Sequence, residues 1–354
     1  MPKRKLSPGK WQRLRSLTDE QGRFFMMAID QRDSLRNGLA EAARTAPAAI
    51  HDDDLTRVKG VIVKTLAPYA SAVLIDPVYG YPQSIEHFPS RVGLLLSHEE
   101  TGYTTGGASE KERQTHLLEG WSVEKAQRLG ADAVKLLLYY RPDGSEEMCH
   151  QQQETARRVG EACAQREMPF LLELVAYPLG EGNADGLAYA RKKPELVIKS
   201  AEEFSKPDYQ VDILKLEFPA DLKWTREYAG GAFDGKQRQT AYALSDVEAY
   251  CRQLNAAAAI PWVILSAGVN IEEFLAQTAM ATATGASGFL CGRAIWKDAV
   301  PLYPDMTRME AWLRTEGAYN FVRAKAHAER ALPWPQHRAH GAVRLPGGTE
   351  LPGR

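Results

Sequence analysis

Short runs of apolar residues recur along the chain, and longer segments with helix-like patterns separate them. Most of these separating segments are roughly 30 to 45 residues long, and the helix-like patterns they hold include 121–131 and 271–286. A strand followed by a helix, repeated eight times, predicts a single (β/α)8 TIM barrel of the α/β class, which we place at residues 23–334. The eight candidate strands are 24–30, 71–77, 93–97, 133–140, 170–177, 213–218, 262–268 and 288–296.

Two features of the pattern qualify this prediction. The third unit is the weakest, because only about 15 residues separate Pro77 from Gly93. A doubly wound open sheet is the structural alternative, but no candidate strand is followed by a GxGxxG turn. Outside the barrel, residues 1–22 are polar and basic and form a short N-terminal extension. Residues 335–354 are rich in Pro, Gly and Arg, which predicts a flexible tail.

Charged residues occupy one face of three consecutive candidate strands. In 213–218, Leu214 and Leu216 share one face, so Lys215 lies on the other, because strand side chains alternate. The apolar face of a barrel strand packs against helices, so Lys215 points into the barrel, together with Lys135 and Glu173. Asp30 ends the first strand. Misplaced strand boundaries, or a buried ion pair without chemistry, are the plainer interpretations.

Two lysines beside a carboxylate in a region of low dielectric suit Schiff-base chemistry. A second cation promotes loss of a proton from the lysine amine, which then attacks a carbonyl carbon. We assign Lys215 as the nucleophile, Lys135 as the cation that tunes it and Glu173 as the acid/base. Asp30 is a further candidate for proton handling or for binding the substrate hydroxyls, and Glu217 is interpreted as a balancing charge.

The last two candidate strands predict an anion site. The stretches 265-LSAGV-269 and 291-CGRAIW-296 each place a glycine at a strand end, and the second adds an arginine. In such barrels, the loops after strands seven and eight often bind phosphate through backbone N–H groups. The candidate residues are Ser266, Gly268, Gly292 and Arg293.

Composition narrows the class of partner. The net charge is −1, and no run approaches the roughly 20 apolar residues of a membrane span, so we expect neither nucleic acid nor a membrane as partner. Four scattered cysteines without a CxxC indicate reduced thiols and a cytoplasmic location. We expect no cofactor and no metal, because the histidines form no ligand pattern; the segment 98-HEE-100 is interpreted as a solvated loop rather than a metal site.

Eight motifs in order resemble a known family. They are 28-AIDQR-32, 67-APYASAVLIDPVYG-80, 93-GLLLSHEETGY-103, 130-GADAVKLLLYYRPDG-144, 170-FLLELVAY-177, 212-DILKLEFP-219, 262-WVILSAGV-269 and 285-GASGFLCGRAIW-296. Together they resemble the tagatose 1,6-bisphosphate aldolases, which are metal-independent class I aldolases, over roughly residues 20–334.

The resemblance implies the same site residues. It places the Schiff-base lysine on Lys215, the acid/base on Glu173, the second lysine on Lys135, and a substrate contact on Gln31 beside Asp30. It also places the phosphate-binding turn and arginine on Ser266, Gly268, Gly292 and Arg293. The implied reaction is reversible cleavage of a ketohexose bisphosphate into dihydroxyacetone phosphate and glyceraldehyde 3-phosphate.

Two alternatives stay open. The last two motifs resemble sulfofructose 1-phosphate aldolases equally well, which would put a sulfonate in place of one phosphate. A non-catalytic sensor of sugar phosphates is the alternative of a different class, although it would not need the lysines and glutamate of the predicted site. The sequence does not settle whether the chain forms a homo-oligomer.

Overall fold

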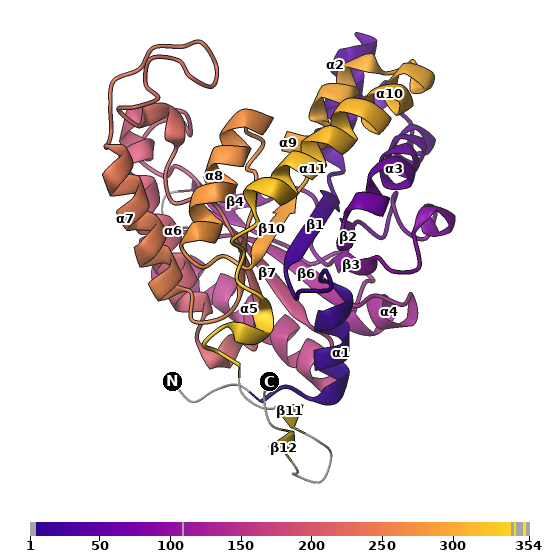
Figure 1. Cartoon of the computed structure of the whole chain (residues 1–354), viewed down its shortest axis with the longest axis horizontal. Helices are drawn as coiled ribbons and strands as arrows, with labels where there is room; N and C mark the ends of the chain where they lie inside the picture. Colours follow the sequence, from indigo (N-terminus) through magenta and orange to yellow (C-terminus); the bar gives the residue numbers. More distant parts are fainter. Residues whose placement is uncertain (1–4, 108–109, 341–342, 345–349, 352–354) are drawn as a thin grey trace.

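The computed structural model describes residues 5–107, 110–340, 343–344 and 350–351. Eight parallel strands close into a barrel in the order β1-β10-β9-β8-β7-β6-β3-β2, which confirms the predicted barrel and excludes the open sheet (Figure 1). The barrel strands are β1 (Phe24–Ile29), β2 (Ala72–Ile75), β3 (Gly93–Ser97), β6 (Ala133–Tyr139), β7 (Phe170–Val175), β8 (Ile213–Leu216), β9 (Trp262–Ile264) and β10 (Gly288–Cys291).

Helices surround the barrel. They are α1 (Pro8–Ser16), α2 (Asp33–Ala43), α3 (Asp52–Leu66), α4 (Val123–Arg128), α5 (Glu146–Gln165), α6 (Leu187–Phe204), α7 (Leu244–Ala257), α8 (Ile271–Ala283), α9 (Arg293–Trp296), α10 (Met306–Trp312) and α11 (Ala318–His327). Side chains of Ser122, Ser145 and Asn270 accept hydrogen bonds from the first turns of α4, α5 and α8. These caps satisfy backbone donors that have no partner inside the helix. None of the described helices is both long enough and apolar enough to cross a membrane.

The short third unit has a local explanation. β2 and β3 are joined by turns and the short 3-10 helix η3 (Ile85–His87) instead of an α-helix. After β3 the chain forms an antiparallel hairpin, β4 (Thr104–Gly106) with β5 (Glu112–Gln114), before α4 begins. The alternation of apolar runs did not indicate this hairpin, because its strands are too short and too polar to show a period.

The alternation of side chains divides each strand between two cores. Leu136, Leu172 and Leu214 point outward into the large core under the helices. The inward positions fill the lower half of the barrel with a second apolar cluster, which includes Met26, Leu74, Leu95, Ala133, Leu171, Ile213, Val263 and Leu290. The inward positions one step higher on three strands are polar. The barrel is therefore plugged below and hollow above.

Described segments near both ends of the chain pack beneath the barrel. Leu14 and Leu17, in the predicted N-terminal extension, are buried in the inner cluster. Trp11 lies against Trp334 with ring centroids 4.6 Å apart, and His337 is also buried, so residues 335–340 of the predicted tail pack against the body. Beyond residue 340 the structure describes only the pair β11 (Val343–Arg344) and β12 (Glu350–Leu351), and the rest of the predicted tail lies outside the described residues.

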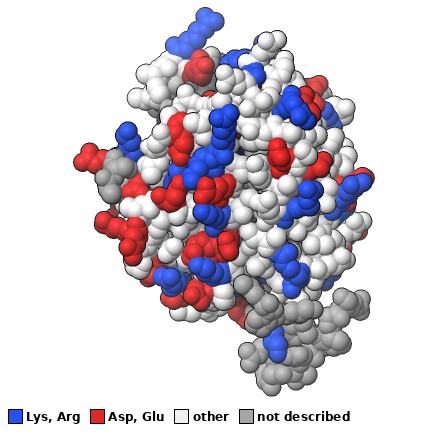
Figure 2. All heavy atoms as spheres, turned by 90° about the vertical axis from the view of Figure 1, so that its left-hand side faces the viewer, with Lys and Arg blue, Asp and Glu red and all other residues white. Residues whose placement is uncertain are grey.

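The surface agrees with the near-zero net charge. On the face shown in Figure 2, basic and acidic side chains are intermixed. Several ion pairs among the described residues lie one helical turn apart, such as Lys199 with Glu195 at 2.7 Å. Such exposed pairs contribute little to the free energy of unfolding. The mixture of signs gives the face in Figure 2 no strong field of one sign.

Candidate active site

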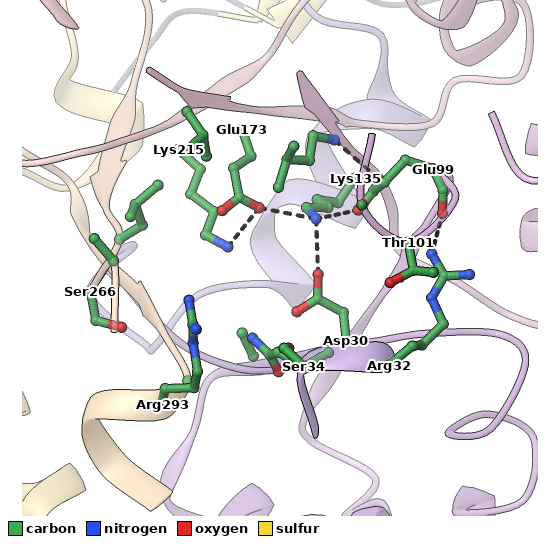
Figure 3. Close-up of a pocket in the computed structure, with 18 of the residues that line it drawn as sticks. Asp30, Arg32, Ser34, Glu99, Thr101, Lys135, Glu173, Lys215, Ser266 and Arg293 are labelled. Atoms are coloured by element: carbon green, nitrogen blue, oxygen red, sulfur yellow. Dashed lines mark hydrogen bonds and ion pairs between the residues drawn. The ribbon is translucent and has the colours of Figure 1, made fainter. Parts of the chain in front are cut away.

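A polar cavity of about 460 Å³ opens at the carboxyl ends of the barrel strands. Its wall includes all of the predicted catalytic residues, together with Gln31, Ser266, Gly292 and Arg293. In a parallel barrel the ends of all eight strands meet at this rim, so residues far apart in sequence share one cavity. Figure 3 shows the charged side chains converging in it.

Lys215 and Glu173 come from neighbouring strands. They are register partners in the pairing of β7 with β8, and both point inward because each occupies the inward parity of its strand. Lys215 Nζ donates a hydrogen bond of 2.8 Å to Glu173 Oε2, and both side chains are at least nine-tenths buried. The amine is thus held in the cavity by a carboxylate that can exchange protons with it.

Lys135 binds three carboxylates. Its Nζ lies 2.8 Å from Asp30 Oδ2 and 3.0 Å from Glu173 Oε2, and it also donates a short hydrogen bond to Glu99 Oε1. Burial lowers the pKa of Lys135, but Asp30, Glu173 and Glu99 together raise that pKa well above its ordinary value. Lys135 is therefore a permanent cation in this cavity.

The pKa values of the neighbouring carboxyl groups are lowered. Burial raises the pKa of Asp30 and of Glu173, but the positive charges of Lys135 and Lys215 outweigh burial and lower both values. The cavity therefore holds ionised carboxylates and cations at neutral pH. Glu173 is shared between the two lysines, so each proton transfer to or from it changes the field at both.

Glu99 is a site residue that the sequence interpretation missed. We expected 98-HEE-100 to be a solvated loop, and this is wrong for its first two residues, because His98 and Glu99 are 5% and 6% exposed. The segment folds over the barrel rim: His98 N donates to Lys135 O, and Glu99 Oε2 accepts from Leu137 N. Burial lowers the pKa of His98 to about 4, so this histidine is neutral.

Arg32 was also missed as a separate site residue. It follows Asp30 and Gln31, is 7% exposed and lines the cavity. One of its amino groups donates a short hydrogen bond to the backbone carbonyl of Glu99. Its position inside the motif 28-AIDQR-32 was the available signal. Gln31 Oε1 is buried and has no hydrogen-bond partner among the described residues, so it is free to accept one from a ligand.

The loops after β9 and β10, where the sequence predicts an anion site, lie on one side of Lys215 (Figure 3). Ser266, Gly292 and Arg293 line the cavity, whereas Gly268 lies under the arginine. Gly268 has a φ of +79°, and a Cβ there would lie 3.3 Å from Arg293 Cζ, so glycine suits both the backbone and the space. Lys297 Nζ donates to the carbonyls of Gly268 and Val269, which ties the two loops together.

Glu217 contacts groups outside the catalytic cluster. Its Oε2 accepts a hydrogen bond of 2.7 Å from Ala176 N, and its Oε1 lies 3.2 Å from Lys193 Nζ. These contacts agree with a charge-balancing role. Among the described residues, no group of three or more His, Cys, Asp or Glu side chains is arranged to hold a metal ion.

The chain is similar to known aldolases. Residues 24–298 match the profile of the DeoC/LacD family of aldolases. The chain is 37% identical to tagatose 1,6-diphosphate aldolase 2 of Enterococcus faecalis, over 89% of this chain and 92% of the relative. It is 34% identical to the tagatose 1,6-diphosphate aldolase of Streptococcus agalactiae, over 89% of this chain and 94% of the relative.

A solved structure of a Schiff-base-forming fructose-1,6-bisphosphate aldolase has the same fold. It superposes with a TM-score of 0.53 at 16% identity and covers 91% of this chain and 100% of the other. At this identity the similarity concerns the barrel alone.

Proposed function

This chain belongs to the DeoC/LacD family of aldolases, which are aldehyde-lyases, and on that premise we propose that it is a class I aldolase for tagatose 1,6-bisphosphate. The products would be dihydroxyacetone phosphate and glyceraldehyde 3-phosphate. The observation that carries the proposal is the contact of Lys215 with Glu173, inside a cavity that also holds Lys135 as a second cation.

In the proposed mechanism, Lys215 Nζ attacks the C2 carbonyl of the open-chain ketose. Glu173 transfers the protons that convert the carbinolamine to an iminium ion with loss of water. The C3–C4 bond then breaks. Its electron pair moves toward the iminium nitrogen to form an enamine, while the C4 hydroxyl gives up its proton and becomes the aldehyde. Protonation of the enamine at C3 and hydrolysis release dihydroxyacetone phosphate and restore Lys215.

Asp30 and Lys135 suit the hydroxyl-bearing part of the sugar. Asp30 is ionised and lies 2.8 Å from Lys135 Nζ, so together they offer an acceptor and a donor beside the nucleophile. We assign Asp30 to the substrate hydroxyls, with the proton of the C4 hydroxyl as its most direct task. Lys135 would stabilise the negative charges of Asp30 and Glu173 while protons move.

The positions of two arginines in the cavity wall support a substrate with two anionic ends. In Figure 3, Ser266 and Arg293 lie on one side of Lys215 and Asp30, and Arg32 lies with Thr101 on the other side. We assign the first end to the phosphate on C1, next to the reacting C2, with Gly268 and Gly292 shaping it. We assign Arg32 to the second anion, because a guanidinium binds phosphate oxygens in a bidentate manner.

We infer a small-molecule sugar phosphate as ligand, without a cofactor or nucleic acid, in the reducing environment of the cytoplasm. The four cysteines are free thiols, which agrees with such an environment. Whether the chain forms a homo-oligomer stays open.

A coupled assay tests the reaction and the sugar together. Tagatose 1,6-bisphosphate, fructose 1,6-bisphosphate and sulfofructose 1-phosphate are offered separately, and release of dihydroxyacetone phosphate is followed. We expect the highest kcat/KM with tagatose 1,6-bisphosphate. A clear preference for the sulfonated sugar would keep the mechanism and change the substrate. No cleavage of any ketose phosphate, with binding still detectable, would favour the sensor alternative.

A further inference from the structure

A second buried ion pair lies behind the catalytic cluster, between α3 and the barrel wall. Lys59 Nζ lies 2.5 Å from Asp76 Oδ2, and both side chains are 0% exposed. Lys59 belongs to α3, which packs alongside β1, and Asp76 directly follows β2 (Figure 1). Neither side chain is in the wall of the active-site cavity.

Stability alone does not explain this pair. Lys59 interrupts the buried apolar stripe of α3, which is formed by Leu55, Val58, Ile62, Val63 and Leu66. Taking two charges out of water costs free energy that their attraction only partly returns, and an apolar pair at such a place is often as stable or more stable. Burial lowers the pKa of Lys59, and Asp76 opposes that shift.

The contacts of the pair lead to the catalytic cluster. Lys59 Nζ also donates a hydrogen bond of 2.7 Å to the carbonyl oxygen of Ile29, the residue directly before Asp30. The carbonyl of Ala28, one residue earlier, accepts a hydrogen bond of 3.0 Å from Trp296 Nε1. Two side chains from outside the barrel therefore hold the last two peptide groups of β1, where the chain turns to present Asp30.

Asp76 is itself fixed by the backbone. Its Oδ1 accepts hydrogen bonds from the N–H groups of Val78 and Tyr79 at 2.9 and 2.7 Å. This leaves Oδ2 for Lys59. The ammonium group of Lys59 is thus held by Asp76 beyond the end of β2, and it in turn holds the carbonyl of Ile29 at the end of β1.

The charge of Lys59 also reaches the active site. Burial raises the pKa of Asp30, Lys135 and Lys215 lower it, and Lys59 adds to their effect. Arg32 is a further charged group that acts on Lys59, together with Asp76 and Asp30. The pair therefore acts on Asp30 in two ways, through the hydrogen bond of Lys59 to the preceding carbonyl and through the charge of Lys59.

We propose that Lys59, anchored by Asp76, is a positioning residue for Asp30. It holds the carbonyl group of Ile29, and this sets the direction in which the Asp30 carboxylate enters the cavity. The inference rests on the proposed function, in which Asp30 handles the substrate hydroxyls. A small displacement of a reacting group can slow turnover strongly, even when the substrate still binds.

The test is a mutant cycle that asks whether the pair acts through Asp30. Lys59→Met with Asp76→Asn removes both charges together, so no buried charge is left unpaired, and the Asn oxygen still accepts from Val78 and Tyr79. We expect kcat to fall by about 10- to 100-fold, with KM changed by less than about threefold. In an Asp30→Asn background the same change should lower kcat by less than about threefold, because the group it positions is already lost.

A matched control uses an ion pair at the opposite end of the barrel. Lys10 Nζ lies 2.8 Å from Asp212 Oδ2, and both side chains are largely buried. Lys10→Met with Asp212→Asn should leave kcat within about twofold of the wild type, because Asp212 holds the start of β7 instead of a strand end at the cavity. Circular dichroism and thermal melting verify that each variant folds.

Two results would overturn the inference. One is a kcat close to wild type in the Lys59 and Asp76 replacement. The other is an equal loss in the Asp30→Asn background, which means that the pair supports the fold in general. If the double replacement does not fold, Asp76→Asn alone is measured in both backgrounds against the same criteria. Wild-type turnover decides the proposed function separately, so failure of either idea is visible without failure of the other.

Discussion

Lys215 and Glu173 are register partners on β8 and β7, and Lys215 Nζ donates a 2.8 Å hydrogen bond to Glu173 Oε2. The same oxygen lies 3.0 Å from Lys135 Nζ. One carboxylate oxygen therefore serves a nucleophile candidate on one side and a permanent cation on the other. In the proposed mechanism Lys215 becomes an iminium ion, and Glu173 is placed to give and receive the protons involved.

Glu173→Gln tests the acid/base assignment. We expect kcat to fall by roughly 10²- to 10⁴-fold with a much smaller change in KM, because the amide keeps the shape of the side chain but cannot transfer a proton. Steady-state kinetics on tagatose 1,6-bisphosphate measure both parameters. Glu217→Gln is the matched control, since Glu217 lines the same cavity but bonds to Ala176 and Lys193, and it should lose far less activity. A large rise in KM at normal kcat would make Glu173 a binding residue.

Two arginine variants distinguish the two proposed anion-binding ends of the cavity. Arg293→Ala should raise KM for the bisphosphate and weaken inhibition by dihydroxyacetone phosphate, each by roughly 10- to 100-fold, as expected for a lost charged hydrogen bond. Arg32→Ala should raise KM for the bisphosphate by a similar factor but leave that inhibition nearly unchanged. If both variants weakened inhibition by dihydroxyacetone phosphate equally, the assignment of the two ends would be contradicted.

Chelation should leave the activity unchanged. In the proposed mechanism the iminium ion withdraws electrons from the C3–C4 bond, so no Lewis acid is needed to polarise the carbonyl. Overnight dialysis against EDTA followed by assay in metal-free buffer measures this. Inactivation that zinc reverses would rule out the Schiff-base mechanism.

Glu273 predicts a pH-dependent stability outside the catalytic cluster. Burial and the nearby Asp221 raise the pKa of Glu273 from 4.5 to about 7. The folded state therefore binds this proton more tightly than the unfolded state. The contribution of Glu273 to stability is fully present below pH 4.5 and is lost as pH rises toward 7. Glu273→Gln removes the charged form and should increase the free energy of unfolding at pH 8 by up to about 3 kcal/mol, with almost no change at pH 4.5. Urea unfolding at both pH values measures the difference, and an equal effect at both would refute the raised pKa.

Much of the fold could be predicted from the periodic spacing of apolar residues along the sequence. Leu136, Leu172 and Leu214 identify the outward face of their strands. Because side chains alternate along a strand, the adjacent Lys135, Glu173 and Lys215 were correctly predicted to point inward. The structure confirms the barrel and brings these residues into one cavity, while their chemical roles stay predictions.

Other features of the site could not be predicted from the spacing of apolar residues. Glu99 follows β3 in an irregular segment whose backbone bonds to Lys135 and His116, and nothing in its sequence distinguishes that path from a solvated loop. Lys59 did leave a signal, because it is a charged residue within an apolar helical stripe, but its partner Asp76 lies beyond the end of a strand and shares no pattern with it. Long-range polar contacts of this kind depend on tertiary geometry.

The most direct test of the central claim is borohydride trapping with dihydroxyacetone phosphate. The protein is incubated with this ligand, reduced, digested and examined by mass spectrometry. We predict a covalent adduct on Lys215 alone, no adduct in a folded Lys215→Met variant, and residual turnover of that variant below about 1%. An adduct on Lys135, or no adduct while the ligand still binds, would contradict Lys215 as the Schiff-base residue.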